Sequence, residues 1–513
     1  MKNKNKLNYS PIIFSTLIVL TITIIFTLMY GTHGIEGSDT SYLRGFSYDL
    51  IHGKKLKENI FFSFPFTLFF SSLIYLPMIT GNVLLERFFH FLLIGITSYC
   101  SFSFLRQKED KSNHKLIYFL PVILILNISN FPVGINYTII ASTLGCLAIF
   151  LHQREKSLGV GLCLSLSYFS KDSFLFFNLL FLIIIFFEKD REYFLKTIAF
   201  IIVGTISFKL LELTPIYGKT TPSFVKIALK TNLRKLFNSG IKAYFQDLKF
   251  IFIILGYYAN HSLLISKKKI IFTSLFFCIA AYKVFTFNQQ YVPWAIPIGI
   301  MAFNLLLGDT LFKIKRKIFN ANILLFLSLA WSTGLSDTQP GPWPLIGTFF
   351  FIHTFKKSTW AVISAVIFFS INHYFKQYPY RTAPRSELNY DLGEINPLYK
   401  YIYTSEDKFK KINEMIELSK IYKRVHVLPA FSDANIFMNK LFCLPMTWDV
   451  AASFGKVEEF VKYDPFIKKE LKNCDAIILE KNVPTKYTLR TRYVLKHWKK
   501  IKETTNYIVY QEK

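Results

Sequence analysis

The sequence predicts an α-helical membrane protein with many spans and a small soluble α/β domain at its C-terminal end. The chain has 513 residues, of which 52% are hydrophobic and 55 are Phe. Apolar runs of about 20 residues recur between Pro11 and Phe375. In lipid, such a run satisfies its backbone N–H and C=O groups only as a helix, because an open strand leaves them unpaired. A membrane barrel would show shorter segments of alternating hydrophobicity instead.

About thirteen of these runs predict membrane-spanning helices. They cover residues 11–30, 83–105, 116–131, 137–152, 158–170, 173–188, 195–212, 249–265, 270–287, 290–308, 319–335, 343–355 and 359–375. The first run follows a Lys-rich start, but it is longer than the apolar region of a signal peptide and lacks a small-residue cleavage site. It is therefore interpreted as an uncleaved first span.

The apolar segment 60–78 is long enough to span, but Pro65, Pro77 and several hydroxyl residues favour a re-entrant or interfacial helix. The distribution of Lys and Arg supports that interpretation. If 60–78 does not cross, the basic connections all face the cytoplasm, as the positive-inside rule requires. The short connections on the opposite side together carry only Lys171. The N-terminus is therefore predicted to be cytoplasmic.

An odd number of spans that starts from a cytoplasmic N-terminus ends outside the cytoplasm. The sequence therefore predicts a membrane domain at 1–375 and an extracytoplasmic domain at 376–513. The outer loops of the membrane domain are 31–82 and 213–248, and the second of these has the spacing of an amphipathic helix lying along the membrane. The net charge of +28 resides in loops beside the membrane, so anionic membrane lipids or lipid-linked phosphates are the expected partners. Nucleic acid is excluded as a partner.

The C-terminal segment has the pattern of a small α/β domain. Residues 405–422 show helical periodicity, and a second helix is predicted near 456–472. Short strands are predicted at 425–428, 476–479 and 507–510. Cys443 and Cys474 form a disulfide if this domain is exported, or remain two free thiols. The sequence leaves both possibilities open.

Two carboxylates follow the first span directly. Glu36 and Asp39 lie a few residues beyond its outer end, with glycines on both sides that allow a sugar or phosphate to approach the backbone. A carboxylate held there can take a proton from an acceptor hydroxyl as a general base. The alternative is that Asp39 caps an interfacial helix over 40–51.

The order of motifs resembles the GT-C superfamily of membrane glycosyltransferases, which includes the protein O-mannosyltransferases and the aminoarabinose transferases. The matching features are Asp39, Tyr42 and Gly53, then Phe62-Ser63-Phe64-Pro65-Phe66, Leu84-Leu85-Glu86-Arg87-Phe88, Tyr168-Phe169-Ser170-Lys171-Asp172, Asn288-Gln289-Gln290-Tyr291 and Val427-Leu428-Pro429 with Asp433. The chain lacks the strict Asp-Glu pair of the mannosyltransferases. The resemblance therefore names neither the sugar nor the acceptor.

The resemblance implies an enzyme that transfers a hexosyl or pentosyl group from a polyprenyl-phosphate sugar donor to a glycan, lipid or protein acceptor. Asp39 is the expected catalytic base, with Glu36 as second choice. The expected substrate-binding residues are Tyr42, Arg44, Lys171, Asp172, Gln289 and Gln290. Lys171 is the leading contact for the departing phosphate and Arg44 the next, while the polar residues orient sugar hydroxyls.

No metal cluster is evident in the sequence, and we expect no metal or other cofactor. The expected location is a bacterial inner membrane, with transfer at its outer face. A polysaccharide polymerase or ligase, a multi-span transporter and a non-catalytic scaffold are the alternatives. A transporter usually carries an internal repeat and broken helices near the middle of the membrane. A polymerase or ligase usually places its large outer loop late in the chain.

Overall fold

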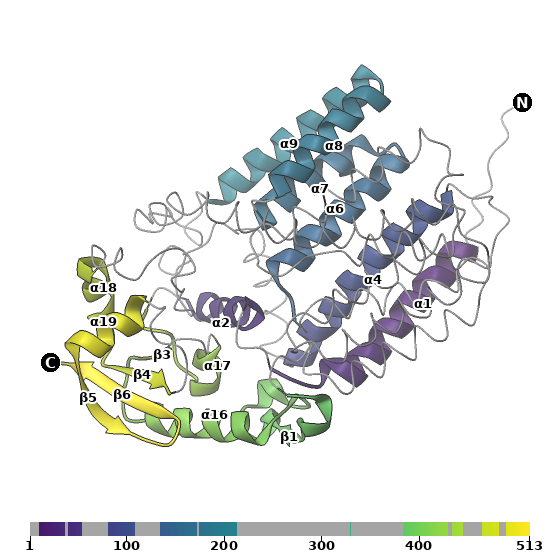
Figure 1. Ribbon diagram of the computed structural model, residues 1–513. Coiled ribbons are helices and arrows are strands. Elements are labelled where there is room, and N and C mark those ends of the chain that lie inside the picture. The colour runs from purple at the N-terminus through teal and green to yellow at the C-terminus, as the bar shows by residue number, and fades with distance from the viewer. Residues whose placement is uncertain are drawn as a thin grey trace, which may run out of the picture.

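The structure is a computed structural model that describes residues 10–35, 39–53, 81–107, 134–171, 174–212, 329, 383–428, 433–444, 464–481 and 489–513. These residues form a stack of long helices with an α/β domain at one end (Figure 1). The segments 60–78 and 213–248, the predicted span 116–131, all predicted spans after 212 and the boundary at 375/376 lie outside the described residues. The total of thirteen spans and the division into two domains therefore stay predictions.

Six predicted spans fall within the described residues, and each is helical. They correspond to α1 (Ser10–Phe26) with the π-helical turn η1 (Thr27–Gly31), α4 (Val83–Gln107), α6 (Tyr137–Gln153), α7 (Ser157–Ser170), α8 (Phe174–Glu188) and α9 (Arg191–Glu212). The polar segment after η1 leads into a further helix, α2 (Asp39–Ile51). The alternative expectation of a helix over 40–51 agrees with these bounds, and its position at the membrane interface stays a prediction.

The long helices pack side by side in the order α1, α4, α6, α7 and α9, with α8 beside α7 and α9 (Figure 1). Small residues bring α7 and α9 close together. A Cβ added at Gly161 of α7 would lie 2.4 Å from the carbonyl oxygen of Thr197 on α9. Between α4 and α6, the hydroxyls of Thr97 and Thr143 are 2.9 Å apart and share a hydrogen bond. Close approach through small residues and hydroxyl bonds is typical of helices that pack within lipid.

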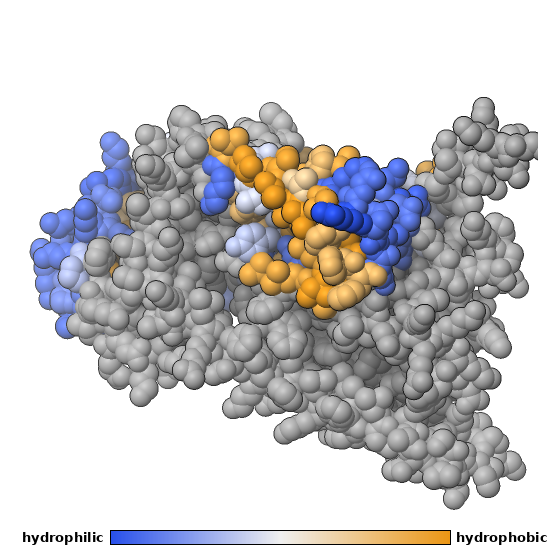
Figure 2. Space-filling model, turned by 90° about the horizontal axis from the view of Figure 1, so that it is seen from above, coloured by the Kyte–Doolittle hydropathy of each residue, from blue (hydrophilic) through white to orange (hydrophobic). Residues whose placement is uncertain are grey.

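The outer surface of α8 and α9 is apolar (Figure 2). Its exposed large hydrophobic residues are Leu175, Leu179, Ile183, Phe186, Phe187, Leu195, Ile202, Val203, Ile206 and Leu210. Within the described residues, Val83–Cys100 and Arg191–Leu210 are long and apolar enough to cross a membrane, and only 17% of the second is buried inside the protein. A continuous apolar surface of this kind is unfavourable in water and suits contact with lipid. The described helices thus have the length and the apolar surface that suit a membrane.

The described C-terminal residues form the expected α/β domain. Its main sheet has the order β3–β4–β6–β5. β3 (Val425–Leu428) and β4 (Ala476–Glu480) are parallel, and β6 (Tyr507–Glu512) runs antiparallel to β4 and to the edge strand β5 (Trp498–Glu503). The predictions for β3, β4 and β6 are confirmed, whereas β5 was not predicted.

Helices cover both faces of this sheet. The predicted helix at 405–422 is α16 (Glu406–Ser419), and α17 (Ala434–Met438), α18 (Asp464–Leu471) and α19 (Leu489–His497) complete the layers. Side chains of β4 alternate between the two faces. Ala476 and Ile478 belong to one buried core with α16, and Ile477 and Leu479 to a second core with α18 and α19. Short elements precede α16: η4 (Arg385–Glu387), β1 (Tyr390–Asp391), η5 (Leu392–Glu394), η6 (Pro397–Tyr399) and β2 (Tyr403–Thr404).

The first of these cores continues into the membrane domain. Ile35, Tyr48 of α2 and Val83 of α4 are buried in the same cluster as Tyr399 and Ile436 of the C-terminal domain. Helix α2 thus lies between the ends of the long helices and the C-terminal α/β domain (Figure 1). A shared core of this kind fixes the first loop, the helix ends and the C-terminal domain relative to one another.

Cys443 and Cys474 are joined by a disulfide, which resolves the pairing that the sequence left open. The two residues are 31 positions apart, and a cross-link closing a loop of that length stabilises the folded state by about 3.5 kcal/mol in the chain-entropy model.

We expect a reductant to lower the melting temperature of the wild-type protein, because it removes this cross-link. The same reductant should leave the double variant Cys443→Ser/Cys474→Ser unchanged, and an equal shift in both would contradict the assignment.

Candidate active site

One end of the helix stack gathers the segments that the sequence analysis singled out. η1 ends the first helix against α4, since a Cβ added at Gly31 would lie 3.1 Å from Cβ of Arg87. The chain then turns at Gly34, which has a φ of 75°. This left-handed conformation favours glycine. The turn directs the carbonyl of Gly34 at Arg87, whose Nη2 donates to it at 2.9 Å. The buried Arg87 side chain thus holds the start of the first loop on α4.

The same short segment pairs with the C-terminal domain. The N–H of Gly34 donates to the carbonyl of Tyr403 at 2.8 Å, and the N–H of Tyr403 donates to the carbonyl of Thr32 at 2.7 Å. These bonds make a parallel β-bridge between His33 and Tyr403. At the start of α4, Asn82 adds a contact by donating from Nδ2 to the carbonyl of Lys400 at 2.6 Å. The first loop and the C-terminal domain therefore lie on the same side of the helix stack.

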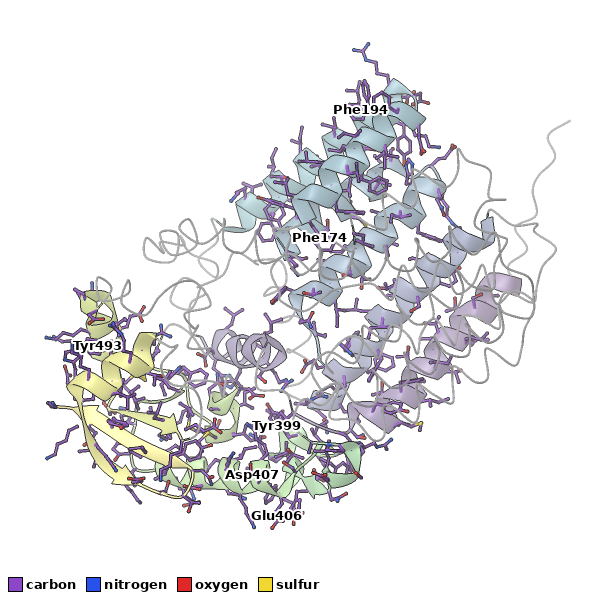
Figure 3. The ribbon with its side chains drawn as sticks, viewed as in Figure 1. Phe174, Phe194, Tyr399, Glu406, Asp407 and Tyr493 are labelled. Atoms are coloured by element: carbon purple, nitrogen blue, oxygen red, sulfur yellow. A yellow bond between two sulfur atoms is a disulfide. The ribbon has the colours of Figure 1, made fainter. Side chains whose placement is uncertain are left out.

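Arg44 of α2 occupies the centre of this junction. Its Nε donates to Oε2 of Glu86 on α4 at 2.7 Å, and its Nη1 donates to Oδ2 of Asp433 at 2.7 Å. The side chains of Arg44 and Asp433 are 1% and 0% exposed. The hydroxyl of Tyr399 donates to the same Oδ2 at 2.9 Å, where the C-terminal domain meets the helix ends (Figure 3). One guanidinium is thus enclosed by carboxylates from two different parts of the chain.

Further hydrogen bonds hold α2 on α17 of the C-terminal domain. Nδ2 of Asn435 donates to Oδ1 of Asp49 at 2.6 Å and to the carbonyl of Gly45 at 2.7 Å. The hydroxyl of Tyr48 donates to Oδ1 of Asn439 at 2.8 Å. These contacts involve Gly45, Tyr48 and Asp49, so the second half of α2 is held by α17 and by Asn439, which follows α17.

Lys171 reaches the same region from α7. Its side chain is fully buried, its Nζ donates to Oγ1 of Thr138 at 3.2 Å, and it lies 5.4 Å from the ring centre of Tyr137. Ile135 lies three residues before Thr138, and its N–H donates to Oε1 of Glu86 at 3.2 Å. A separation of three residues corresponds to at most about 11 Å of extended chain. Arg44, through Glu86, and Lys171 are therefore anchored to one short segment at the start of α6.

The structure places some of the predicted site residues and leaves others undescribed. Asp39 is the first residue of α2, five residues before Arg44, or about 7.5 Å along the helix axis. Tyr42 lies in the first turns of the same helix. Nothing is described of the side chains of Asp39 and Tyr42, and Glu36, Asp172, Gln289 and Gln290 lie outside the described residues. The catalytic and substrate-binding roles stay predictions.

The charges at the junction act on one another. Burial lowers the pKa of Arg44, but the carboxylate of Glu86, the hydroxyl of Tyr399 and the carboxylate of Asp433 outweigh burial and raise it. Burial raises the pKa of Asp433 above its usual value, although Arg44, the hydrogen bond from Tyr399 and Lys408 of α16 act in the opposite direction. Arg44 therefore remains a cation, and the guanidinium is what allows a carboxylate to exist at this depth.

Sequence analysis did not identify the partners of Arg44. Glu86 and Asp433 were noticed only as members of motifs, and Tyr399 was not singled out. The available signal was the presence of a carboxylate at the first turn of an apolar helix, where burial requires a partner. Within the described ranges, no three His, Cys, Asp or Glu side chains are placed to hold a metal ion.

No protein-family model matches the chain, and no curated protein matches it either. Among solved structures, the chain is similar to the crystal structure of ArnT from Cupriavidus metallidurans in the apo state. The similarity has 10% sequence identity, covers 97% of each chain and has a TM-score of 0.44. An identity and a TM-score this low are too weak to establish a shared fold or a family.

His33 gives the junction a pH dependence. Burial, and then Arg385 and Arg87, lower the pKa of His33 from 6.5 to about 4. As pH falls from 6.5 towards 4, the unfolded chain takes up a proton that folded His33 does not, so the free energy of unfolding decreases. Uptake of one proton limits this slope to about 1.4 kcal/mol per pH unit, and solvent screening of the partly exposed side chain reduces it.

We expect His33→Asn, which does not titrate, to lose less stability than the wild type between pH 7 and pH 4.5. Melting temperatures of the full chain in detergent at both pH values provide the measurement. Equal losses in the two proteins would show that His33 is not held neutral at this junction.

Proposed function

We propose that this chain is a membrane glycosyltransferase that moves a sugar from a polyprenyl-phosphate donor to an acceptor at the outer face of a bacterial inner membrane. The observation that carries the proposal is the presence of two buried cations, Arg44 of α2 and Lys171, that are both anchored at the start of α6. Burying charge at a membrane boundary costs free energy, and such groups are usually kept because they act on a substrate.

In this proposal Asp39 accepts the proton of the acceptor hydroxyl while that oxygen forms a bond to the anomeric carbon of the sugar. The bond between the anomeric carbon and the phosphate oxygen breaks, and its electron pair leaves with the lipid phosphate. Lys171 stabilises the negative charge that develops on the departing phosphate. Transfer of this kind needs one base and one or more cations.

The remaining predicted residues have supporting roles in the proposal. Glu36 is the second choice for the base. Tyr42, Asp172, Gln289 and Gln290 contact the sugar or orient its hydroxyls. The acceptor is a glycan, a lipid or a protein that approaches from the side of the C-terminal domain.

The disulfide supports the assignment of the outer face. Disulfides persist in oxidising compartments such as the bacterial periplasm and are rare in the cytosol. Cys443 and Cys474 belong to the C-terminal domain, which contacts the first loop through the His33–Tyr403 bridge. If the domain is exported, the first loop and Asp39 share its compartment.

Replacement of the base tests the proposal directly. We expect Asp39→Asn to reduce transfer by roughly 10²- to 10⁴-fold, the usual contribution of a general base. The assay uses membranes containing the full chain, supplied with polyprenyl-phosphate hexose or pentose that is radiolabelled in the sugar, and measures the label leaving the lipid.

The matched control is Asp407→Asn, the same chemical change at an exposed residue of α16 on the outer surface of the C-terminal domain (Figure 3). The Asp407→Asn protein should transfer sugar at the wild-type rate. Asp407 is solvent-exposed, so the ion pair that it forms with Lys411 contributes little to stability. Wild-type activity in a well-folded Asp39→Asn protein would remove Asp39 as the base. No transfer by the wild type from any of these donors would refute the proposed function.

A further inference from the structure

Asp433 and Arg44 are 389 positions apart in the sequence, yet they form a buried ion pair. The pair uses only part of the hydrogen-bonding capacity of the two groups. Arg44 donates from Nε to Glu86 and from Nη1 to Asp433, and Oδ2 of Asp433 accepts the side-chain bonds from both Arg44 and Tyr399. Nη2 of Arg44 and Oδ1 of Asp433 are buried and have no hydrogen-bond partner among the residues that the structure describes.

The geometry of this ion pair is not the one that would stabilise it most. Arginine and a carboxylate commonly form two parallel hydrogen bonds, and that arrangement would satisfy Nη2 and Oδ1 together. A buried donor or acceptor without a partner costs free energy, so each such group in a folded protein calls for an explanation. Here an unused donor and an unused acceptor belong to two side chains that already touch.

Nη2 of Arg44 is a hydrogen-bond donor and Oδ1 of Asp433 is an acceptor, and this combination indicates which chemical group could bind to them. A hydroxyl group both donates and accepts a hydrogen bond, so one hydroxyl can satisfy Nη2 and Oδ1 at once. A phosphate cannot, because it would bring negative charge next to Glu86 and Asp433. Arg44 already faces these two carboxylates, and counting the nearby Lys408 makes the cluster neutral and not positive.

We propose that Arg44 and Asp433 together bind a hydroxyl of the transferred sugar, with Nη2 of Arg44 donating to it and Oδ1 of Asp433 accepting from it. This inference rests on the proposed function. It gives Arg44 a sugar contact in place of the phosphate contact expected from the sequence. It also makes the C-terminal domain part of the substrate site, since that domain supplies Asp433.

Burial has two consequences for such a site. The bound hydroxyl is shielded from water, which strengthens both of its hydrogen bonds. Entry of the sugar requires α17 to move away from α2, because Asn435 and Asn439 hold the two helices together through Asp49 and Tyr48. Substrate binding is therefore coupled to the contact between the two domains.

Binding of two lipids to the full chain tests the inference without relying on catalysis. The probes are undecaprenyl phosphate bearing a hexose or a pentose, and undecaprenyl phosphate without a sugar, each titrated into purified protein and followed by native mass spectrometry. Asp433→Asn should weaken binding of the sugar-bearing lipid by about 10- to 100-fold, the loss expected for a hydrogen bond to a charged group. Its affinity for the sugar-free lipid should stay at the wild-type value.

Two further variants separate binding from structure. Tyr399→Phe removes a bond to Oδ2 of Asp433 and leaves Oδ1 and Nη2 in place, so it should alter the affinity for the sugar-bearing lipid much less than Asp433→Asn. Arg44→Lys keeps the positive charge but removes Nη2, and it should reproduce the selective loss even if Asp433→Asn fails to fold.

Several outcomes would overturn the inference. Equal weakening of both lipids would mean that the pair only holds the domains together. Unchanged affinity for both would mean that a buried water molecule occupies the two atoms. If the wild type prefers the sugar-bearing lipid in either of those cases, the inference fails but the proposed function survives. A wild type that shows no preference for any sugar-bearing lipid would refute the inference and the proposed function together.

Discussion

The enclosure of Arg44 by Glu86 and Asp433 is the interaction on which the arrangement of this end of the molecule depends. A guanidinium is tolerated at this depth only with its carboxylates in place, and removing one partner from such a buried group costs roughly 3 to 5 kcal/mol. Glu86 belongs to the long helix α4, Arg44 to α2 and Asp433 to the C-terminal α/β part of the chain. A single side chain thus holds together three parts of the chain that are far apart in the sequence.

The rest of the junction follows from that constraint. With Arg44 fixed, α2 lies between the helix ends and α17, and this helix begins at Asp39. Glu86 also holds the start of α6, which carries Thr138, the partner of Lys171. Arg44 and Lys171 are thereby anchored to one short segment, the start of α6.

Hydrophobic patterning predicted the parts of the fold whose own sequence determines them. The six described spans and the strands β3, β4 and β6 are apolar runs, and α16 has a regular apolar stripe. The strand β5 escaped prediction because it is an exposed edge strand with the sequence Trp-Lys-Lys-Ile-Lys-Glu. Lysines of that kind keep an edge from pairing with another chain and also remove the alternating pattern.

The site was harder to predict than the fold, for a physical reason. A buried arginine is recognisable only through its partners, and Asp433 lies 389 residues from Arg44. The Cys443–Cys474 pairing depends in the same way on a Cα–Cα distance that spacing does not give. Sequence reasoning located Arg44 and Lys171 as notable cations, but it could not assign the groups that enclose them.

The claim that the first loop and the C-terminal domain build one site can be tested by a cross-link at the His33–Tyr403 bridge. Paired strands lie about 4.8 Å apart, within the range of Cα separations that a disulfide spans. After oxidation, His33→Cys/Tyr403→Cys should yield a linked peptide pair by mass spectrometry, whereas His33→Cys with Lys502→Cys on the exposed edge strand should not. Free thiols at both positions in a protein that still forms the Cys443–Cys474 bond would contradict the account.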